Sequence, residues 1–135
     1  MKYFTLLCLL LMLVGCSSSY ERKEINEGIQ QYQKNEEALL IDVRIKAEYL
    51  NGHIEEAILL PLDEIDQNAA QVLNDKNQVI FVYCRSGNRS QQAAQKLVDL
   101  GYTHIIEIGG IIDYVGEIVK GEDLWNLMKS LKKNV

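Results

Sequence analysis

The sequence contains little cysteine, histidine or proline: its 135 residues include three cysteines, two histidines and one proline. Two histidines without ligand spacing give no reason to expect a metal site. The chain also lacks a basic excess, because its formal net charge is −5, so nothing suggests the basic face that a nucleic-acid-binding protein needs. It has no internal repeat or low-complexity segment, and 47% of its residues are hydrophobic. We therefore expect one packed domain.

The longest apolar run lies at the N-terminus and is too short to span a bilayer comfortably. Residues 4–14 form this run after Lys2, which is the charge and length pattern of a signal peptide. The run ends in "LVGC" (13–16), which resembles the lipobox where bacterial lipoproteins are cleaved and acylated on cysteine. We therefore expect the domain to be exported.

These features predict a signal peptide of the lipoprotein type in residues 1–15. A lipidated cysteine with a polar tether follows in residues 16–24, and a folded domain occupies residues 25–135. Lipidation of Cys16 would anchor the domain to a membrane in the cell envelope, in the periplasm or at the cell surface. An ordinary secretory signal that happens to precede Cys16 is the alternative, and it would export the domain as well.

Cys84 is the one thiol expected in the exported domain, because Cys8 would leave with the signal and Cys16 would carry lipid. No disulfide within the domain can then form. An unpaired cysteine in an oxidising compartment is a liability unless it is buried or used. Cys84 is therefore the first candidate for chemistry.

Short apolar runs alternate with helical patterns along the predicted domain. Continuous apolar character is typical of strands buried on both faces, and the alternation predicts an α/β fold with a small central parallel β-sheet and helices on both faces. Sites in such sheets gather at the carboxyl ends of the strands, and Cys84 directly follows one of the runs. The predicted strands are 38–43, 57–62, 78–83 and 104–108, and the helical patterns are 25–35, 46–53, 63–75, 90–101, 109–121 and 123–133.

The loop after Cys84 is basic although the chain is acidic. Arg85 and Arg89 lie in it, and no carboxylate occurs in residues 77–95. A helix N-terminus adds unpaired N–H groups and partial positive charge, and Gly87 tolerates the positive φ that turns such groups inward as an anion nest. These neighbours favour a thiolate. The pattern predicts a nucleophilic sulfur with an anionic substrate, and a buried structural cysteine is the alternative.

Five further segments occur in order along the predicted domain. They are "LLIDVR" (39–44), "EYLNGHI" (48–54), "VYCRSGNRS" (82–90), "LVDLGY" (97–102) and "IGG" (108–110). Together these segments resemble the rhodanese family of sulfurtransferases. The resemblance extends over most of the predicted domain, from about residue 25 to residue 121, and it implies the rhodanese-like fold.

The resemblance implies an enzyme, thiosulfate sulfurtransferase, that works through a persulfide. In this family the cysteine thiolate attacks the outer sulfur of thiosulfate, releases sulfite and becomes a persulfide, whose sulfur then passes to a thiophile such as cyanide. Cys84 would be this catalytic nucleophile. The implied partners are thiosulfate or another small sulfane-sulfur donor and an acceptor that is cyanide, a thiol or a protein. No cofactor is implied, and we expect a monomer.

Roles for further residues follow from the same resemblance. Asp42 would bind the backbone of the cysteine loop, and Arg44 would pair with Glu48. His53 is expected to be a structural hydrogen-bonding residue rather than a general base. The residues expected to bind the substrate anion, through backbone N–H groups and two guanidinium groups, are Arg85, Ser86, Gly87, Asn88 and Arg89.

Two alternative functions share this fold. Rhodanese-related phosphatases and arsenate reductases carry a C-x5-R loop that is one residue longer, and the position of that arginine is occupied here by Ser90. A persulfide carrier or binding module of the cell envelope is the second alternative, although domains that only bind partners usually lack the cysteine. The chain also departs from the family at Glu55-Glu56, where Pro-Gly is usual, and at Tyr114, near the place of a common tryptophan.

Overall fold

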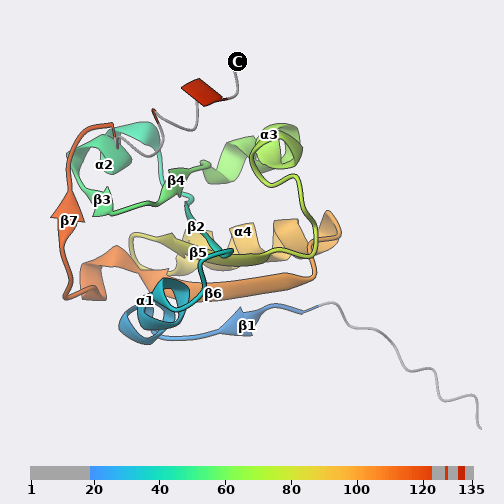
Figure 1. The fold of residues 1–135 in the computed structure, drawn as a ribbon, viewed down its shortest axis with the longest axis horizontal. Helices are drawn as coiled ribbons and strands as arrows, with labels where there is room; N and C mark the ends of the chain where they lie inside the picture. Colours follow the sequence, from blue (N-terminus) through green and yellow to red (C-terminus); the bar gives the residue numbers. More distant parts are fainter. Residues whose placement is uncertain (1–18, 123–126, 128–130, 133–135) are drawn as a thin grey trace, which may run out of the picture.

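The computed structural model describes residues 19–122, 127, 131 and 132 (Figure 1). The predicted signal peptide at 1–15, Cys16 and most of the predicted helix at 123–133 lie outside these residues. Within the described residues, no helix combines the length and the apolar character that crossing a membrane requires.

A parallel sheet of five strands forms the centre of the fold (Figure 1). The strand order is β1-β6-β5-β2-β4, and each neighbouring pair is parallel. This arrangement confirms the predicted α/β class. The strands are β1 (Glu21–Arg22), β2 (Leu39–Asp42), β4 (Ile58–Leu59), β5 (Val79–Cys84) and β6 (His104–Gly110), and an antiparallel pair joins β3 (His53–Ile54) to β7 (Ile118–Val119).

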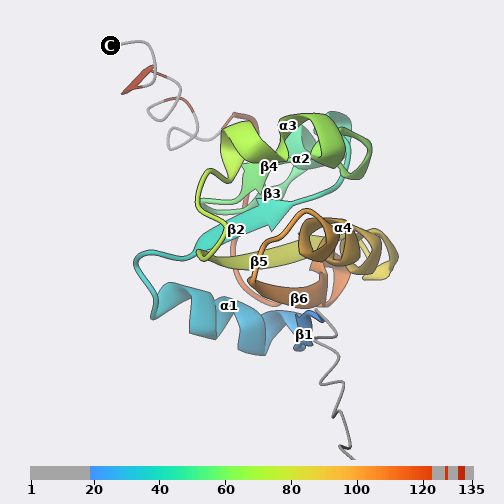
Figure 2. The ribbon, with the colours of Figure 1, turned by 90° about the vertical axis from the view of Figure 1, so that its right-hand side faces the viewer.

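Helices cover both faces of the sheet, as predicted. Figures 1 and 2 show α1 and α4 on opposite sides of it. Side chains of α1 and α2 pack in one buried apolar cluster, and those of α3 and α4 pack in the other. The helices are α1 (Ile25–Gln33), α2 (Lys46–Asn51), α3 (Ile65–Val72) and α4 (Asn88–Asp99), with the 3-10 helices η1 (Leu62–Glu64) and η2 (Ile111–Asp113).

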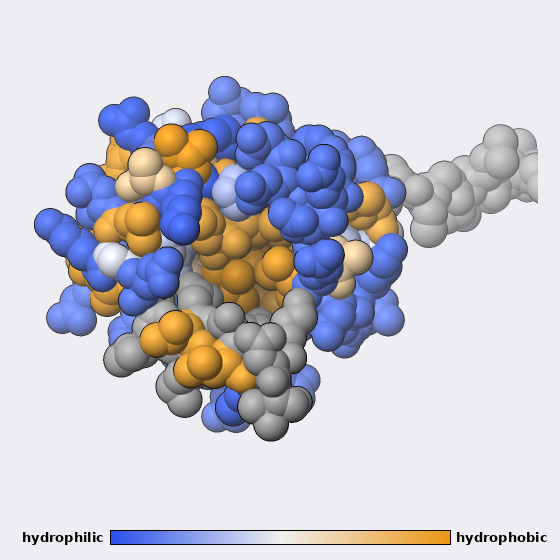
Figure 3. Space-filling model, turned by 90° about the horizontal axis from the view of Figure 1, so that it is seen from above, coloured by the Kyte–Doolittle hydropathy of each residue, from blue (hydrophilic) through white to orange (hydrophobic). Residues whose placement is uncertain are grey.

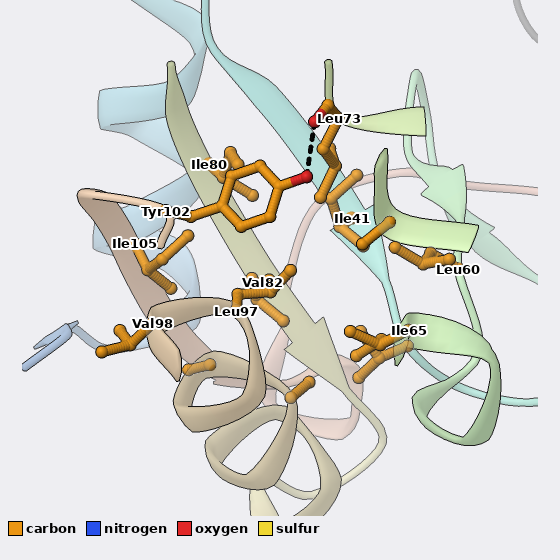
Figure 4. Close-up of a cluster of buried hydrophobic side chains, with 14 of the residues drawn as sticks. Ile41, Leu60, Ile65, Leu73, Ile80, Val82, Leu97, Val98, Tyr102 and Ile105 are labelled. Atoms are coloured by element: carbon orange, nitrogen blue, oxygen red, sulfur yellow. Dashed lines mark hydrogen bonds between the residues drawn. The ribbon is translucent and has the colours of Figure 1, made fainter. Parts of the chain in front are cut away.

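The alternation of side chains along β5 divides the core into these two clusters. Ile80, Val82 and Cys84 face the helices α3 and α4, whereas Phe81 and Tyr83 face α1 and α2. All five side chains are at most 2% exposed, because both faces of a central parallel strand are covered. Figure 4 shows Ile80 and Val82 in contact range of side chains from β2, α3 and α4. The continuous apolar run at 78–83 is thus explained.

Four short strands depart from the sequence-based expectation. Strand β1 lies in the range 16–24, for which the sequence predicts a tether, and it pairs with β6 at the edge of the sheet. Strands β1, β3 and β7 have two residues each, which is too few for a strand periodicity to be recognised. Strand β4 is shorter than the predicted 57–62, and Pro61 beyond it has no N–H to continue a ladder.

The sheet ends at β4, and the apolar interior reaches the surface on that side. The top of the molecule in Figure 1, where α2, β4 and α3 lie, is hollowed, and the hollow has an apolar floor (Figure 3). The described residues therefore cover this edge of the sheet less completely than they cover its two faces.

Gly28 allows α1 to lie directly on β6. A Cβ atom at this position would lie 2.8 Å from Ile108 Cβ and closer still to Ile108 Cγ2, and Gly28 is buried. In the sequence this glycine weakens the helical pattern by about 1 kcal/mol relative to alanine. The structure shows that close helix–strand packing is the reason for it.

We expect Gly28→Ala to lower the free energy of unfolding by about 1–3 kcal/mol, because the added methyl group overpacks against Ile108. At an ordinary helix position the same change would stabilise the protein by about 1 kcal/mol. Chemical denaturation followed by circular dichroism measures the difference. Gln30→Ala, on the exposed side of α1, is the matched control, and a more stable Gly28→Ala variant would contradict the close packing.

Candidate active site

Cys84 lies at the carboxyl end of the central strand β5. Strand β2, which ends at Asp42, is its neighbour on one side. Strand β6 is its neighbour on the other side, and Cys84 lies opposite Gly110 there after an irregularity in the register. The thiol is 1% exposed. The expected position at the carboxyl edge of the sheet is therefore confirmed, and the sulfur lies beneath the loop rather than on the surface.

The Cys84 sulfur is bonded to the start of α4. Gly87 donates its backbone N–H to Cys84 Sγ over 3.0 Å, and the thiol donates to Ser90 Oγ over 3.3 Å. Gly87 has φ of 103° and caps the helix, so its left-handed conformation turns the N–H toward the sulfur. Of the predicted nest at 85–89, the structure shows the Gly87 N–H bonded to the sulfur. Ser86 in the loop and Asn88, the first residue of α4, are exposed.

The Gly-Gly segment at the end of β6 packs against this loop. A Cβ atom at Gly110 would lie 2.5 Å from Ser86 Cα and closer still to the Arg85 carbonyl oxygen. The Ile112 N–H donates to the same Arg85 oxygen over 3.1 Å. The two backbones are therefore in direct contact, which explains why glycine is needed at position 110.

Arg89 is paired with a carboxylate from α2. Its Nη1 and Nη2 atoms donate to the two oxygens of Glu48 over 2.7 and 2.9 Å. The hydrogen bonds from Arg89 lower the pKa of Glu48 to about 2. The predicted role of Arg89 as a free clamp for a substrate anion does not fit this geometry, because the charge of its guanidinium group is already balanced.

Arg44 pairs with Asp42, and the predicted partnership of Arg44 with Glu48 is wrong. Arg44 Nε and Nη2 donate to the Asp42 carboxylate over 3.0 and 2.7 Å, and Nη2 also donates to the Gly52 carbonyl over 2.7 Å. In the described part of the chain, Asp42 accepts from the Arg44 side chain and backbone and not from the loop at 85–89. This buried pair instead links the end of β2 to the end of α2.

His53 is placed by α2 and β3, where it contacts Tyr49. Its Nδ1 atom lies 2.8 Å from the Tyr49 carbonyl oxygen, and its ring stacks on the Tyr49 ring with centroids 3.6 Å apart. This environment fits the structural role expected for it. Among the described residues, no three side chains of histidine, cysteine, aspartate or glutamate are grouped to hold a metal ion.

A hollow of about 270 Å³ opens beside the loop and α2. Arg85 lines it and, unlike Arg89, forms no ion pair with any described residue. Ile112 lines it as well and is 60% exposed. Among the described residues, an anion entering here would meet the unpaired Arg85 guanidinium group, the ion-paired side chains of Arg44 and Glu48, and an apolar wall. The full lining is Arg44, Glu48, Asn51, Gly52, Arg85, Ile111 and Ile112.

Two residues near the sulfur were not recognised as site residues from the sequence. Ser90 is fully buried and donates its hydroxyl proton to Glu107 Oε1 over 2.6 Å. Glu107 is 2% exposed. The sequence signal for Glu107 is its charge within the apolar run 104–108. A strand buried on both faces seldom keeps a carboxylate without a partner, so this residue could have been expected to bind another polar group.

Glu48 should make the stability of the protein depend on pH in acid. Its pKa of about 2 lies below the ordinary value of 4.5, so the ion pair contributes stability that is complete above about pH 4.5 and is lost as the pH falls toward about 2. We expect Glu48→Gln to be less stable than the wild type at neutral pH, and the difference to shrink across that window. Urea denaturation at a series of pH values measures this.

Asp66→Asn is the matched control for this measurement, because Asp66 pairs with Lys96 in an exposed position where such pairs contribute little. A Glu48→Gln variant whose loss of stability is the same at every pH would contradict the ion pair with Arg89.

Comparison with known proteins places this site in a family. Residues 24–116 match the family model described as Rhodanese-like domain. Thiosulfate sulfurtransferase PspE of Escherichia coli is 41% identical over 81 residues, which are 60% of this chain and 78% of that protein. A sulfurtransferase of Allochromatium vinosum is 39% identical over 84 residues, which are 62% of this chain and 77% of that protein.

A solved structure gives the same result. The structure titled "rhodanese with anions from E. coli" is similar with a TM-score of 0.59 and 39% sequence identity, over 62% of this chain and 99% of that chain. The matched residues 24–116 include the cysteine loop, the neighbouring strand ends and the Gly-Gly segment. The chain therefore belongs to the rhodanese-like family.

Proposed function

We propose that this protein is a sulfurtransferase that carries sulfane sulfur on Cys84 as a persulfide. The sulfur would come from thiosulfate or another small donor and pass to a thiophilic acceptor such as cyanide, a thiol or a protein. The observation that carries the proposal is the buried Cys84 sulfur at a strand end, bonded to the Gly87 N–H at the start of α4. The relatives named as sulfurtransferases support it.

The first half-reaction conserves charge. The Cys84 thiolate attacks the outer sulfur of thiosulfate, a sulfur–sulfur bond forms, and the bond between that sulfur and the sulfite group breaks. Sulfite leaves as a dianion, and the persulfide keeps one negative charge. The Gly87 N–H and the N-terminus of α4 are positioned to stabilise this negative sulfur, because preorganised donors cost no rearrangement during the reaction.

The second half-reaction restores the free enzyme. An acceptor with a nucleophilic sulfur or carbon attacks the outer sulfur of the persulfide, and Cys84 leaves as a thiolate. In each step the nucleophile supplies the electron pair of the new bond to the transferred sulfur, and the leaving group keeps the pair of the broken bond. No redox partner or cofactor is therefore required. The loop length from Cys84 to Arg89 supports this reaction over phosphate or arsenate chemistry.

A protein as the acceptor or donor is favoured by the surface beside the hollow. Ile112 is 60% exposed and forms part of the wall of the hollow together with Ile111. Exposed apolar side chains that rim a site are typical of protein contacts. A persulfide carrier with protein partners is therefore the second candidate function.

Intact mass of the protein tests the proposal directly. We expect thiosulfate to add one sulfur atom and cyanide to remove it, and we expect Cys84→Ser to gain nothing while keeping the circular dichroism of the wild type. If the wild type gains no sulfur although an alkylating reagent reaches Cys84, thiosulfate is not a donor. Persulfidated proteins would then be offered in the same assay, and loading from them alone would favour the carrier function.

Arg85 should be the side chain that attracts an anionic donor. We expect Arg85→Ala to raise the KM for thiosulfate about tenfold, corresponding to the loss of roughly 1.4 kcal/mol from one charge-assisted contact, with a much smaller effect on an uncharged donor such as an organic trisulfide. Steady-state kinetics with both donors measure this. Lys96→Ala, elsewhere on α4, is the matched control, and equal effects on the two donors would exclude an electrostatic role for Arg85.

A further inference from the structure

Glu107 is a buried carboxylate that the proposed function does not use. It lies in β6, is 2% exposed, and faces the start of α4. Its Oε1 atom accepts from the Ser90 hydroxyl over 2.6 Å and from the Gly109 N–H over 2.8 Å. Burying a carboxylate is costly unless its bonds are satisfied, so the contacts of this group need an explanation.

Ser90 connects this carboxylate to the reactive sulfur. Its Oγ atom lies 3.3 Å from Cys84 Sγ and 2.6 Å from Glu107 Oε1. The carbonyl oxygens of Gly87 and Gly109 are further away, at 3.0 and 3.4 Å. A hydroxyl has one proton to donate, and the charged, nearest acceptor takes it. Ser90 therefore presents a lone pair to the sulfur, and the thiol donates to it.

This arrangement has a second form with the same two hydrogen bonds reversed. If the thiol proton passes to Ser90 and the Ser90 proton passes to Glu107, the carboxyl group donates to Ser90 and Ser90 donates to the thiolate. The S–H bond breaks and an O–H bond forms on Glu107, while the buried site keeps a single negative charge. Moving a charge between two hydrogen-bonded groups avoids the cost of creating one in a buried place.

We propose that Glu107 is the proton acceptor for Cys84 and acts through Ser90. Glu107 is thus a positioning residue, because it determines the direction of the Ser90 hydroxyl and holds the thiol proton while the sulfur is a thiolate or a persulfide anion. When the acceptor removes the outer sulfur, the proton can return by the same route. The inference rests on the proposed function only in taking Cys84 as the group that reacts.

Of the other charged groups around the pair, Arg22 contacts Glu107 itself, whereas Arg89 and Asp42 are held by partners of their own. Arg22 on β1 lies 3.4 Å from Glu107 Oε2 but is 62% exposed. Arg89 on α4 is paired with Glu48 of α2, and Asp42 on β2 is paired with Arg44. Within the described residues, Glu107 is thus the carboxylate connected to the thiol by hydrogen bonds.

The pH dependence of Cys84 alkylation by iodoacetamide tests the inference without any sulfur donor. The full-length protein is used, and modification of Cys84 is followed by peptide mass. Two groups that share a proton titrate in two steps that belong to the pair. We expect two steps in the wild type and a single step in Glu107→Gln, because an amide cannot accept the proton. Glu107→Asp, which keeps a titrating carboxyl group, should retain two steps.

Glu27→Gln, on the exposed side of α1, is the matched control and should retain both steps. Ser90→Ala provides a second variant in case Glu107→Gln does not fold. Without the hydroxyl donor, we expect the alkylation rate between the two steps to fall about tenfold, as loss of one hydrogen bond to a charged group would cause. A single step in the wild type, two steps in Glu107→Gln, or an unchanged rate in Ser90→Ala would overturn the inference.

A protein that shows the two-step profile but takes no sulfur from any donor would keep this inference and overturn the proposed function. The reverse result, sulfur transfer with a one-step profile in the wild type, would keep the function and remove the role of Glu107.

Discussion

The hydrogen-bonded ladder that holds β5 between β2 and β6 is the constraint on which the site depends. Because all three strands are parallel, their carboxyl ends meet at one edge, and each contributes a different group. Strand β5 supplies Cys84, β2 supplies Asp42, and β6 supplies the Gly-Gly segment and the buried Glu107. The full burial of β5 on both faces fixes the height of the sulfur relative to the start of α4. The Cys84 sulfur is therefore positioned by a strand whose side chains are buried on both faces of the sheet.

The electrostatics of the site are set by pairing rather than by the number of arginines. Arg44 is balanced by Asp42, and Arg89 is balanced by Glu48. Both pairs also connect secondary-structure elements. The Arg44–Asp42 pair joins β2 to the end of α2, and the Arg89–Glu48 pair joins α2 to α4. Arg85 is the guanidinium group of this loop that forms no ion pair with any described residue. The basic character of the loop in the sequence thus overstates its unbalanced positive charge.

The fold and the position of Cys84 at the end of a buried strand could be predicted because their signals are local. The run 78–83 gives the central strand, and the change from apolar to helical pattern places Cys84 at its end. The partners of the loop could not be predicted in the same way, since Glu48 precedes Arg89 by 41 residues and Glu107 follows Ser90 by 17. Which carboxylate meets which arginine depends on how α2 and β6 lie against α4. The strand β1 was missed because two exposed polar residues have no pattern, and only the edge of β6 makes them a strand.

The contact between Gly110 and the cysteine loop limits how the site can change. Because the backbone at Arg85 and Ser86 lies directly on that of Gly110, the loop cannot widen on this side unless β6 moves. Strand β6 is itself fixed by β5 on one edge and carries α1 through Gly28. A cysteine loop one residue longer, as a tetrahedral oxyanion would need, therefore requires β6 to move. Helix α1, which packs on β6 through Gly28, would have to move with it. The size of the cysteine loop is in this sense a property of the whole domain, and any enlargement of the loop would have to begin at β6.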